Sequence, residues 1–269
     1  MPLASTDTGA LHYESVDQTA PWRDTGEAIL FHHGIGSCAE IWRGWWPALI
    51  DAYRLVSFDM RGSGRSVVPP SDFAWSLDLL VEDVFAVADA AGLQRFHLVG
   101  ESMGGTVALA AAIARPDRIA SLTISNGAHV GGSIAGVAAW RRQLDEGGSQ
   151  GWSDAFMPGR FHDGAVPARD RAWFAAQQAR WTRDSILNAL AVLVDTDLTA
   201  RLAEVRCPVL LLHPDGSPFI PVAVMAELAR RLPDSRLNVI GPARHGLPFS
   251  HAAQCVALLR SFLDTRKAD

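Results

Sequence analysis

The sequence predicts a doubly wound α/β fold, in which helices cover both faces of a mostly parallel sheet. Short apolar runs alternate with longer helical patterns, and this alternation is typical of strand–helix–strand units. The short runs are almost continuously apolar, as strands buried on both faces should be. A chain of 269 residues, 48% of them hydrophobic, is also long enough to bury one large core.

The elements can be located in chain order. Residues 10–16, which read ALHYESV, are predicted to form an antiparallel edge strand. The remaining strands are expected at residues 27–33, 53–58, 95–100, 119–124, 207–213 and 235–241. Helices are expected between and after them, at residues 76–92, 104–116, 222–233 and 251–264. Ser76 is a suitable N-cap for the first helix, Gly92 follows its last turn, and Pro116 ends the second.

The alternation stops between about residues 129 and 203, which read as helices and loops. Four tryptophans are spread through this stretch: Trp140, Trp152, Trp173 and Trp181. We interpret residues 129–203 as a helical cap, here called the cap segment, inserted between two core strands. Residues 1–128 and 204–269 would then form the core.

Charge and composition narrow the class of partner. The net charge is −5, from 24 basic and 29 acidic residues that are scattered along the chain. No basic stripe indicates nucleic acid, and no apolar run approaches the roughly 20 residues of a membrane span. We therefore expect a small-molecule substrate, no nucleic acid and no membrane association. Homo-oligomerisation is left open.

The cysteines and the N-terminus favour a cytoplasmic location. Cys38, Cys207 and Cys255 are an odd number in a long chain, which is not a disulfide framework. The first residues lack the basic start and apolar core of a signal peptide. No Cys/His spacing predicts a metal site, and the glycines do not form a phosphate-binding loop, so no cofactor is expected.

The strongest motif is Gly100-Glu101-Ser102-Met103-Gly104, which fits G-x-S-x-G. An apolar strand runs directly into it and an Ala-rich helix leaves it, as a nucleophile elbow requires. Such a sharp turn strains the backbone and brings neighbouring chains close, so glycine is needed on both sides of the serine. The motif predicts Ser102 as a nucleophile.

With this motif the chain resembles the α/β-hydrolase family, from about residue 10 to 265. The segment FHHGIGSCAEIW resembles the family's H-G-x-G loop, and FDMRGSGRS its turn after the next strand. TDLTARLAEVRCP resembles the approach to the seventh strand, and GPARHGLPFSHAAQCVALLRSFL the histidine loop and last helix. SMGG, the short cap and LTISNGAHV are most similar to the enol-lactonase and small-esterase branch, such as 3-oxoadipate enol-lactonase.

The resemblance implies a role for several residues. His245 would be the base that activates Ser102, and the backbone N–H groups of Ile35 and Met103 would form the oxyanion hole. His32 and His33 are expected to support their loop rather than carry protons. Glu101 is interpreted as hydrogen-bonded scaffolding that is close enough to tune the site, and Asp59, Arg61 and Gly62 as a structural turn.

The acid of the triad is less clear. Asp215 fits the family order of nucleophile, acid and base, and is the predicted acid. However, when Pro221 is aligned with the last proline of the family's G-x-x-D-x-x-x-P loop, Ser217 takes the place of the acid. Asp215 then lies two residues upstream, about 6.6 Å away in extended chain. The alternatives are a rearranged loop that brings Asp215 to His245, a weaker arrangement in which Ser217 or a water holds His245, and an acid elsewhere. Asn126 stands where some members of the family carry a second kind of acid.

These features together predict a serine hydrolase that cleaves a small or medium hydrophobic carboxylic ester or lactone through an acyl-enzyme on Ser102. Trp140, Trp152 and Trp181 are predicted to line the substrate pocket, because a cap lies over it. Three alternatives are kept: a carbon–carbon hydrolase of meta-cleavage-type products, a cofactor-free perhydrolase, and a non-catalytic ligand-binding protein on the same fold.

Overall fold

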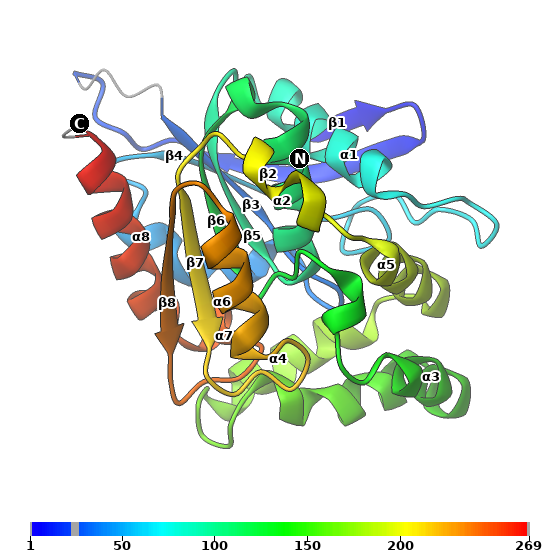
Figure 1. The fold of residues 1–269 in the computed structure, drawn as a ribbon. Helices are drawn as coiled ribbons and strands as arrows, with labels where there is room; N and C mark the ends of the chain where they lie inside the picture. Colours follow the sequence, from blue (N-terminus) through cyan, green and yellow to red (C-terminus); the bar gives the residue numbers. More distant parts are fainter. Residues whose placement is uncertain (1, 23–26, 268–269) are drawn as a thin grey trace.

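An eight-stranded sheet forms the centre of the computed structural model, which describes residues 2–22 and 27–267 (Figure 1). The strand order is β1-β2-β4-β3-β5-β6-β7-β8. The two N-terminal strands pair antiparallel, β2 is antiparallel to β4, and all later neighbours are parallel. The strands are β1 Leu3–Thr6, β2 Gly9–Val16, β3 Ala28–His32, β4 Arg54–Phe58, β5 Phe96–Glu101, β6 Ile119–Ser125, β7 Val209–Pro214 and β8 Ser235–Ile240. This confirms the predicted α/β-hydrolase architecture. β1 was not predicted, and because it pairs with β2, the strand expected at the edge of the sheet is the second strand instead.

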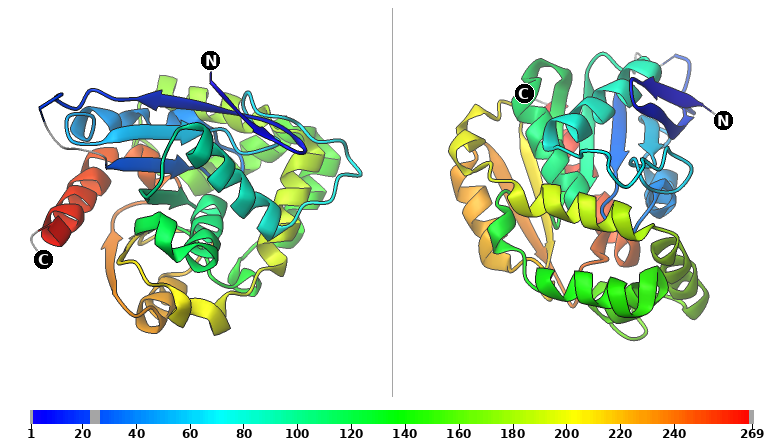
Figure 2. Two further views of the ribbon diagram at one scale, coloured as in Figure 1. Left: turned by 90° about the horizontal axis from the view of Figure 1, so that it is seen from above. Right: turned by 90° about the vertical axis from the view of Figure 1, so that its right-hand side faces the viewer.

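Helices cover both faces of this sheet. They are α1 Leu77–Ala90, α2 Met103–Ala114, α3 Val137–Arg160, α4 Ala168–Ala179, α5 Arg183–Asp195, α6 Val222–Arg231, α7 Leu247–Ser250 and α8 Ala252–Lys267. Short 3-10 turns lie at Ala39–Gly44, Trp46–Ala48, Pro116–Arg118, Gly131–Ser133 and Thr199–Glu204. The sheet twists strongly between the blue N-terminal strands and the orange β8 (Figure 2), as sheets of L-residues do.

The core consists of two apolar clusters, one on each face of the sheet. Consecutive strand residues belong to opposite clusters: Leu30 packs with one and Phe31 with the other, and Leu211 and Leu212 divide in the same way. This alternation is the period of two that a strand imposes on its side chains. Because both faces are covered, both residues of each pair are apolar, which explains the continuous apolar runs in the sequence.

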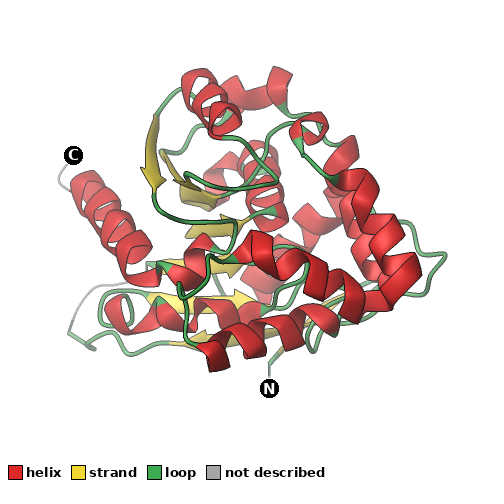
Figure 3. Cartoon of the chain, turned by 90° about the horizontal axis from the view of Figure 1, so that it is seen from below, coloured by secondary structure: helices red, strands yellow, loops and turns green. Residues whose placement is uncertain are grey.

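The cap segment contains α3, α4 and α5, which follow β6 and precede β7 in the chain. In Figure 1 the arrowheads of β7 and β8 point toward the end of the molecule where α3 and α4 lie. Seen from that end, helices lie in front of the strands (Figure 3). In α/β sheets, ligands bind outside the carboxyl ends of the strands, so this is where a site is expected. None of the described helices is long and apolar enough to cross a membrane.

Candidate active site

Ser102 lies at the turn between β5 and α2, in the backbone conformation expected of a nucleophile elbow. Its φ of 54° and ψ of −120° are strained for a residue with a side chain. The turn is also too tight for larger neighbours. A Cβ on Gly100 would lie 2.3 Å from the Gly104 carbonyl oxygen, and one on Gly104 would lie 2.4 Å from that of His32. The two glycines of the motif therefore allow the turn that presents Ser102.

His245 meets Ser102 from the opposite side of the site. Its Nε2 lies 3.0 Å from Ser102 Oγ, across 143 residues of sequence. The loop that carries His245, between β8 and α7, is held by its backbone: the His245 N–H donates to the Gly159 carbonyl at 3.2 Å, and Asn126 Nδ2 donates to the His245 carbonyl at 2.6 Å. The structure therefore brings together the two side chains on which the sequence prediction depends.

The other nitrogen of His245 contacts a hydroxyl. Nδ1 lies 3.1 Å from Ser217 Oγ, which also accepts weak hydrogen bonds from the N–H groups of Phe219 at 3.4 Å and Ile220 at 3.3 Å. For Nε2 to accept the Ser102 proton, the neutral ring must carry its proton on Nδ1 and donate it to Ser217. Ser217 can accept the Nδ1 hydrogen of this tautomer and so orient the ring, but it brings no negative charge.

Asp215 requires a correction, because its carboxylate does not reach His245. Oδ1 accepts the Ala243 N–H at 2.9 Å, and the Asp215 N–H donates to the Ile240 carbonyl at 2.9 Å. The carboxylate packs so tightly over Gly241 that a Cβ there would lie 2.0 Å from Oδ2. β7 ends at Pro214, and Asp215 is the first residue after it. Ser217, two residues further along the loop, contacts the imidazole instead. Its observed role is to fasten the loop that precedes His245.

The two predicted oxyanion-hole amides are unoccupied by protein acceptors. Among the described residues, neither the Ile35 N–H nor the Met103 N–H has a hydrogen-bond partner. Met103 is the first residue of α2, so its N–H is one of the donors that a helix start leaves free. Ile35 lines the same pocket as Ser102 and His245.

A buried ion pair lies beside these groups. Arg160 Nη1 is 3.7 Å from Glu101 Oε1, and the same carboxylate oxygen is 3.9 Å from His245 Nε2. All three side chains are almost fully buried. Burial raises the pKa of Glu101 to about 7, although Arg160 and the Gly34 N–H oppose the shift. Burial, together with Arg160 and His213, lowers the pKa of His245 well below its usual value. The imidazole is therefore neutral at pH 7 and ready to accept a proton.

The pocket at Ser102 is apolar and nearly closed. Its lining residues are Ile35, Ser102, Ile134, Trp140, Arg160, Leu193, Phe219, Ile220 and His245. The free volume is only about 20 Å³, enough for about one water molecule. Sites for small organic ligands usually measure 300–1,000 Å³. A substrate can therefore enter only if some of these lining side chains move.

The three tryptophans predicted to line the pocket lie in three different environments. Trp140 lines the pocket. Trp152 lies behind it, with ring centroids 5.3 Å from Trp140 and 5.0 Å from Phe156. Trp181 donates from Nε1 to the Ser37 carbonyl at 2.9 Å and so supports the loop after Ile35. Trp152 and Trp181 are absent from the residues that line the pocket.

Five lining residues were not predicted from the sequence: Ile134, Arg160, Leu193, Phe219 and Ile220. Phe219 follows the loop of Ser217, and its ring lies edge-on to the His245 ring with centroids 4.8 Å apart; its position in the acid loop was a usable signal. Arg160 lies in the cap segment, where no motif marks it. His33 holds its loop as expected, since its Nε2 accepts the Met60 N–H at 2.9 Å and its Nδ1 lies 2.9 Å from the Gly34 carbonyl oxygen.

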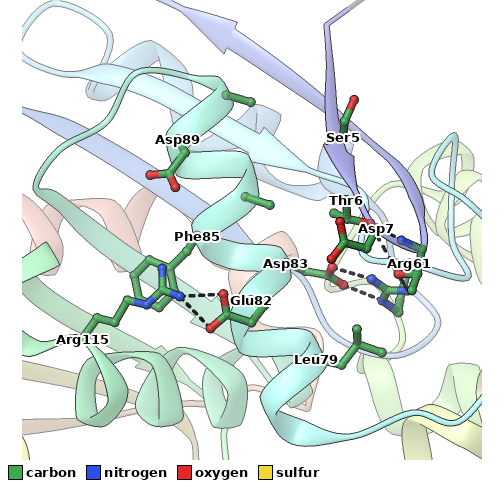
Figure 4. Close-up of a pocket in the computed structure, with 13 residues that line it drawn as sticks. Ser5, Thr6, Asp7, Arg61, Leu79, Glu82, Asp83, Phe85, Asp89 and Arg115 are labelled. Carbon is green, nitrogen blue, oxygen red and sulfur yellow. Dashed lines mark hydrogen bonds and ion pairs between the residues drawn. The ribbon is translucent and has the colours of Figure 1, made fainter.

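A larger open pocket lies elsewhere, beside β1 and α1 (Figure 4). Four of its charged side chains pair with one another: Arg61 with Asp83, and Arg115 with Glu82. It contains none of the residues predicted to act in catalysis. In the described part of the chain, no group of three or more His, Cys, Asp or Glu side chains could hold a metal ion.

Comparisons with known proteins agree with this geometry. The profile of a family described as "alpha/beta hydrolase fold" matches residues 27–148. A protein of Caulobacter segnis named putative carbamate hydrolase RutD is 30% identical over 241 residues, which cover 82% of this chain and 85% of that protein. The crystal structure of the enol-lactonase from Burkholderia xenovorans LB400 superimposes with a TM-score of 0.88 at 21% identity, over 98% of this chain and all of that one. A thermophilic esterase from Thermogutta terrifontis gives a TM-score of 0.84 at 23% identity, over 98% of both chains. The extent of the Caulobacter segnis match, together with the fold and the elbow, establishes that this chain belongs to the α/β-hydrolase family of enzymes.

Proposed function

We propose that the protein is a serine hydrolase that cleaves a small or medium hydrophobic carboxylic ester or lactone through an acyl-enzyme on Ser102. The observation that carries this proposal is the 3.0 Å contact between Ser102 Oγ and His245 Nε2 inside an apolar pocket. The cap segment, residues 129–203, supplies Trp140, Ile134 and Leu193 to that pocket. A substrate whose acyl group is apolar fits this lining best.

The chemistry follows from the positions of these groups. His245 Nε2 takes the proton of Ser102 as Oγ attacks the substrate carbonyl. The negative charge that develops on the carbonyl oxygen is stabilised by the Ile35 and Met103 N–H groups. The protonated His245 then gives its proton to the leaving oxygen, and the acyl group stays on Ser102. Water, deprotonated by the same imidazole, releases the acid and regenerates the serine.

Ser217 in place of a carboxylate favours a reactive substrate. The hydroxyl orients the ring through Nδ1 but does not stabilise the imidazolium that forms in the transition state. His245 is therefore a weaker base than in a complete triad. Esters and lactones, which have good leaving groups, make smaller demands on this base than amides do.

A carbamate is the second candidate substrate class. The observation that favours it is the Caulobacter segnis relative, which is named a putative carbamate hydrolase and matches most of this chain. A carbamate carbonyl would pass through the same attack, oxyanion and acyl-serine steps. Its cleavage would leave a carbamoylated rather than an acylated Ser102.

The test is a panel of p-nitrophenyl esters of increasing acyl length, several lactones and a p-nitrophenyl carbamate, assayed with wild type and Ser102→Ala. Ser5→Ala, on the distant strand β1, is the matched control. We expect turnover by wild type and the control and none by Ser102→Ala. When hydrolysis is quenched, wild type and the control should show a mass increase equal to the acyl group, and Ser102→Ala should not. Undiminished ester hydrolysis by Ser102→Ala would refute the serine mechanism. Faster turnover of a meta-cleavage dienolate, or peroxide-dependent halogenation with acetate, would replace the ester or lactone assignment.

A further inference from the structure

We propose that Arg160 and Glu101 form a positioning pair that sets the oxyanion hole. Glu101 ends β5 directly before Ser102, and Arg160 is the last residue of α3 in the cap segment. Neither residue takes or gives a proton in the proposed mechanism, although Glu101 Oε1 lies 3.9 Å from His245 Nε2. Their role depends on the proposed function, because an oxyanion hole matters only if Ser102 attacks a carbonyl.

The Ile35 N–H belongs to the peptide unit between Gly34 and Ile35. The two side chains hold the peptide units directly before and after that one. Glu101 Oε2 accepts the Gly34 N–H at 2.8 Å, and Arg160 Nη2 donates to the Ile35 carbonyl at 2.6 Å. The peptide unit between them is fixed by a third contact, because His33 Nδ1 lies 2.9 Å from the Gly34 carbonyl oxygen. In a trans peptide the C=O and N–H point in opposite directions. The Ile35 N–H is therefore turned away from His33 and left free for a ligand.

The pair is hard to explain by stability alone. Both side chains are almost fully buried, and taking two charges out of water costs about as much as their attraction returns. The guanidinium is held further by Gln178 Oε1, which accepts from Nε at 3.1 Å. A rigid, multiply bonded charge beside a catalytic loop is better explained by the geometry that it enforces.

The same end of α3 also holds the base. The carbonyls of Gly159 and Arg160 accept the N–H groups of His245 and Gly246, at 3.2 Å and 2.9 Å. One helix end in the cap segment is thus bonded to the oxyanion loop through the Arg160 side chain and to the histidine loop through its backbone. The Arg160 side chain can be altered without removing the backbone bonds, so its effect on the oxyanion hole is separable.

The experiment uses Arg160→Lys and Glu101→Gln in the full chain, with a neutral p-nitrophenyl ester that wild type hydrolyses. Lysine keeps the charge but lacks the planar fork that serves Ile35, Glu101 and Gln178 together. Glutamine keeps an acceptor for Gly34 but removes the charge. Arg183→Lys is the matched control, since Arg183 is a half-exposed arginine of the cap segment that pairs with Asp145.

We expect kcat to fall about 10- to 100-fold in both variants, as small displacements of catalytic groups do, with KM changed by less than about threefold. The inhibition constant of a trifluoromethyl ketone, which forms a tetrahedral oxyanion adduct with an active serine, should rise by the same factor as kcat falls. The affinity for the corresponding alcohol, which forms no oxyanion, should not change. Arg183→Lys should match wild type throughout.

Several results would overturn the positioning role. One is wild-type kcat and ketone affinity in both variants. A second is an increase in KM confined to esters that carry a carboxylate, which would make Arg160 a receptor for an anionic substrate group. A third is unfolding of both variants below the assay temperature, which would make the pair a stability element. None of these results depends on Ser102→Ala, whose retained activity would refute the proposed function separately.

Discussion

At the scale of single residues, the most consequential position is 217, where the chain carries a hydroxyl instead of a carboxylate. Ser217 accepts a hydrogen bond from His245 Nδ1 but adds no charge. With burial and Arg160 both lowering the pKa of His245, the imidazole stays neutral to unusually low pH. Protonation of His245 should therefore limit the activity of wild type only well below the usual histidine pKa of about 6.5. A fall in kcat that begins near pH 7 would instead report the protonation of Glu101, whose pKa burial raises to about 7.

Replacement of Ser217 by aspartate should change this pH dependence in a defined direction. A carboxylate beside Nδ1 stabilises the imidazolium and raises the pKa of His245, so the acid limb of kcat/KM should move to higher pH. The stronger base should also raise kcat on an ester by about 10-fold, a small part of the effect that a full acid has in serine proteases. The measurement is kcat/KM against pH for wild type, Ser217→Asp and Ser217→Asn. An unmoved acid limb in Ser217→Asp would contradict the assigned contact.

Asp215 should tolerate a change that a triad acid would not. Its Oδ1 serves only as an acceptor for the Ala243 N–H, and the side-chain oxygen of asparagine can take over that bond. We expect Asp215→Asn to keep kcat within a few-fold of wild type, while Asp215→Ala loses about 1 kcal/mol of unfolding free energy. Ester kinetics and urea denaturation of both variants provide the check. A loss of several orders of magnitude in Asp215→Asn would restore Asp215 as the acid.

The sequence specified some of these residues and not others, for physical reasons. Ser102 is recognisable because its turn requires glycines at fixed spacing, and His245 because it lies between a strand and the last helix. The partner of His245 could not be chosen between Asp215 and Ser217. The backbone path of a loop containing Pro214 and Pro218 does not follow from the sequence alone. Arg160 was invisible, since its role depends on contacts with residues 125 and 59 positions away.

At the scale of elements, the bounds of the core strands and helices could be predicted from the sequence. For the cap segment only its helical character could be predicted. The buried strands have continuous apolar runs because helices cover both sheet faces, and such runs leave little ambiguity. The helices of the cap segment have weaker patterns. The interruption of α3 at Gly148, where φ is 61° and ψ is −164°, was not predicted; it lies between the turns that carry Trp140 and Trp152.

This interruption yields a prediction about stability. A Cβ on Gly148 would meet nothing within 4 Å, so the cost of Gly148→Ala comes from the backbone alone. Gly148 lies in a backbone region that is essentially restricted to glycine, where alanine is disfavoured by roughly 1–3 kcal/mol. Gly147→Ala is the matched control: its Cβ also meets nothing within 4 Å and its φ is not in the left-handed range, so it should be neutral or stabilising by up to about 1 kcal/mol. Equal unfolding free energies for the two variants, measured by urea denaturation, would mean that α3 is continuous.

At the scale of the whole molecule, the core and the cap segment together leave too little space beside Ser102 for a substrate. The free volume of about 20 Å³ beside Ser102 is too small for any ester, so the largest lining side chain should limit which substrates bind. Trp140 is that side chain, and it packs against Trp152 and Phe156, which do not line the pocket. Trp140→Phe removes one ring and keeps the aromatic packing.

We therefore expect Trp140→Phe to shift the preference in kcat/KM from short toward longer acyl chains. Each extra methylene that finds room should gain about 0.8 kcal/mol, or roughly fourfold in kcat/KM. The readout is the ratio of kcat/KM for hexanoate and acetate p-nitrophenyl esters, which cancels any common effect on folding or on the base. Trp22→Phe is the control, because Trp22 is 85% exposed and does not line the pocket. An unchanged ratio in Trp140→Phe would mean that the acyl chain lies elsewhere, along a path that opens only when the whole cap segment moves.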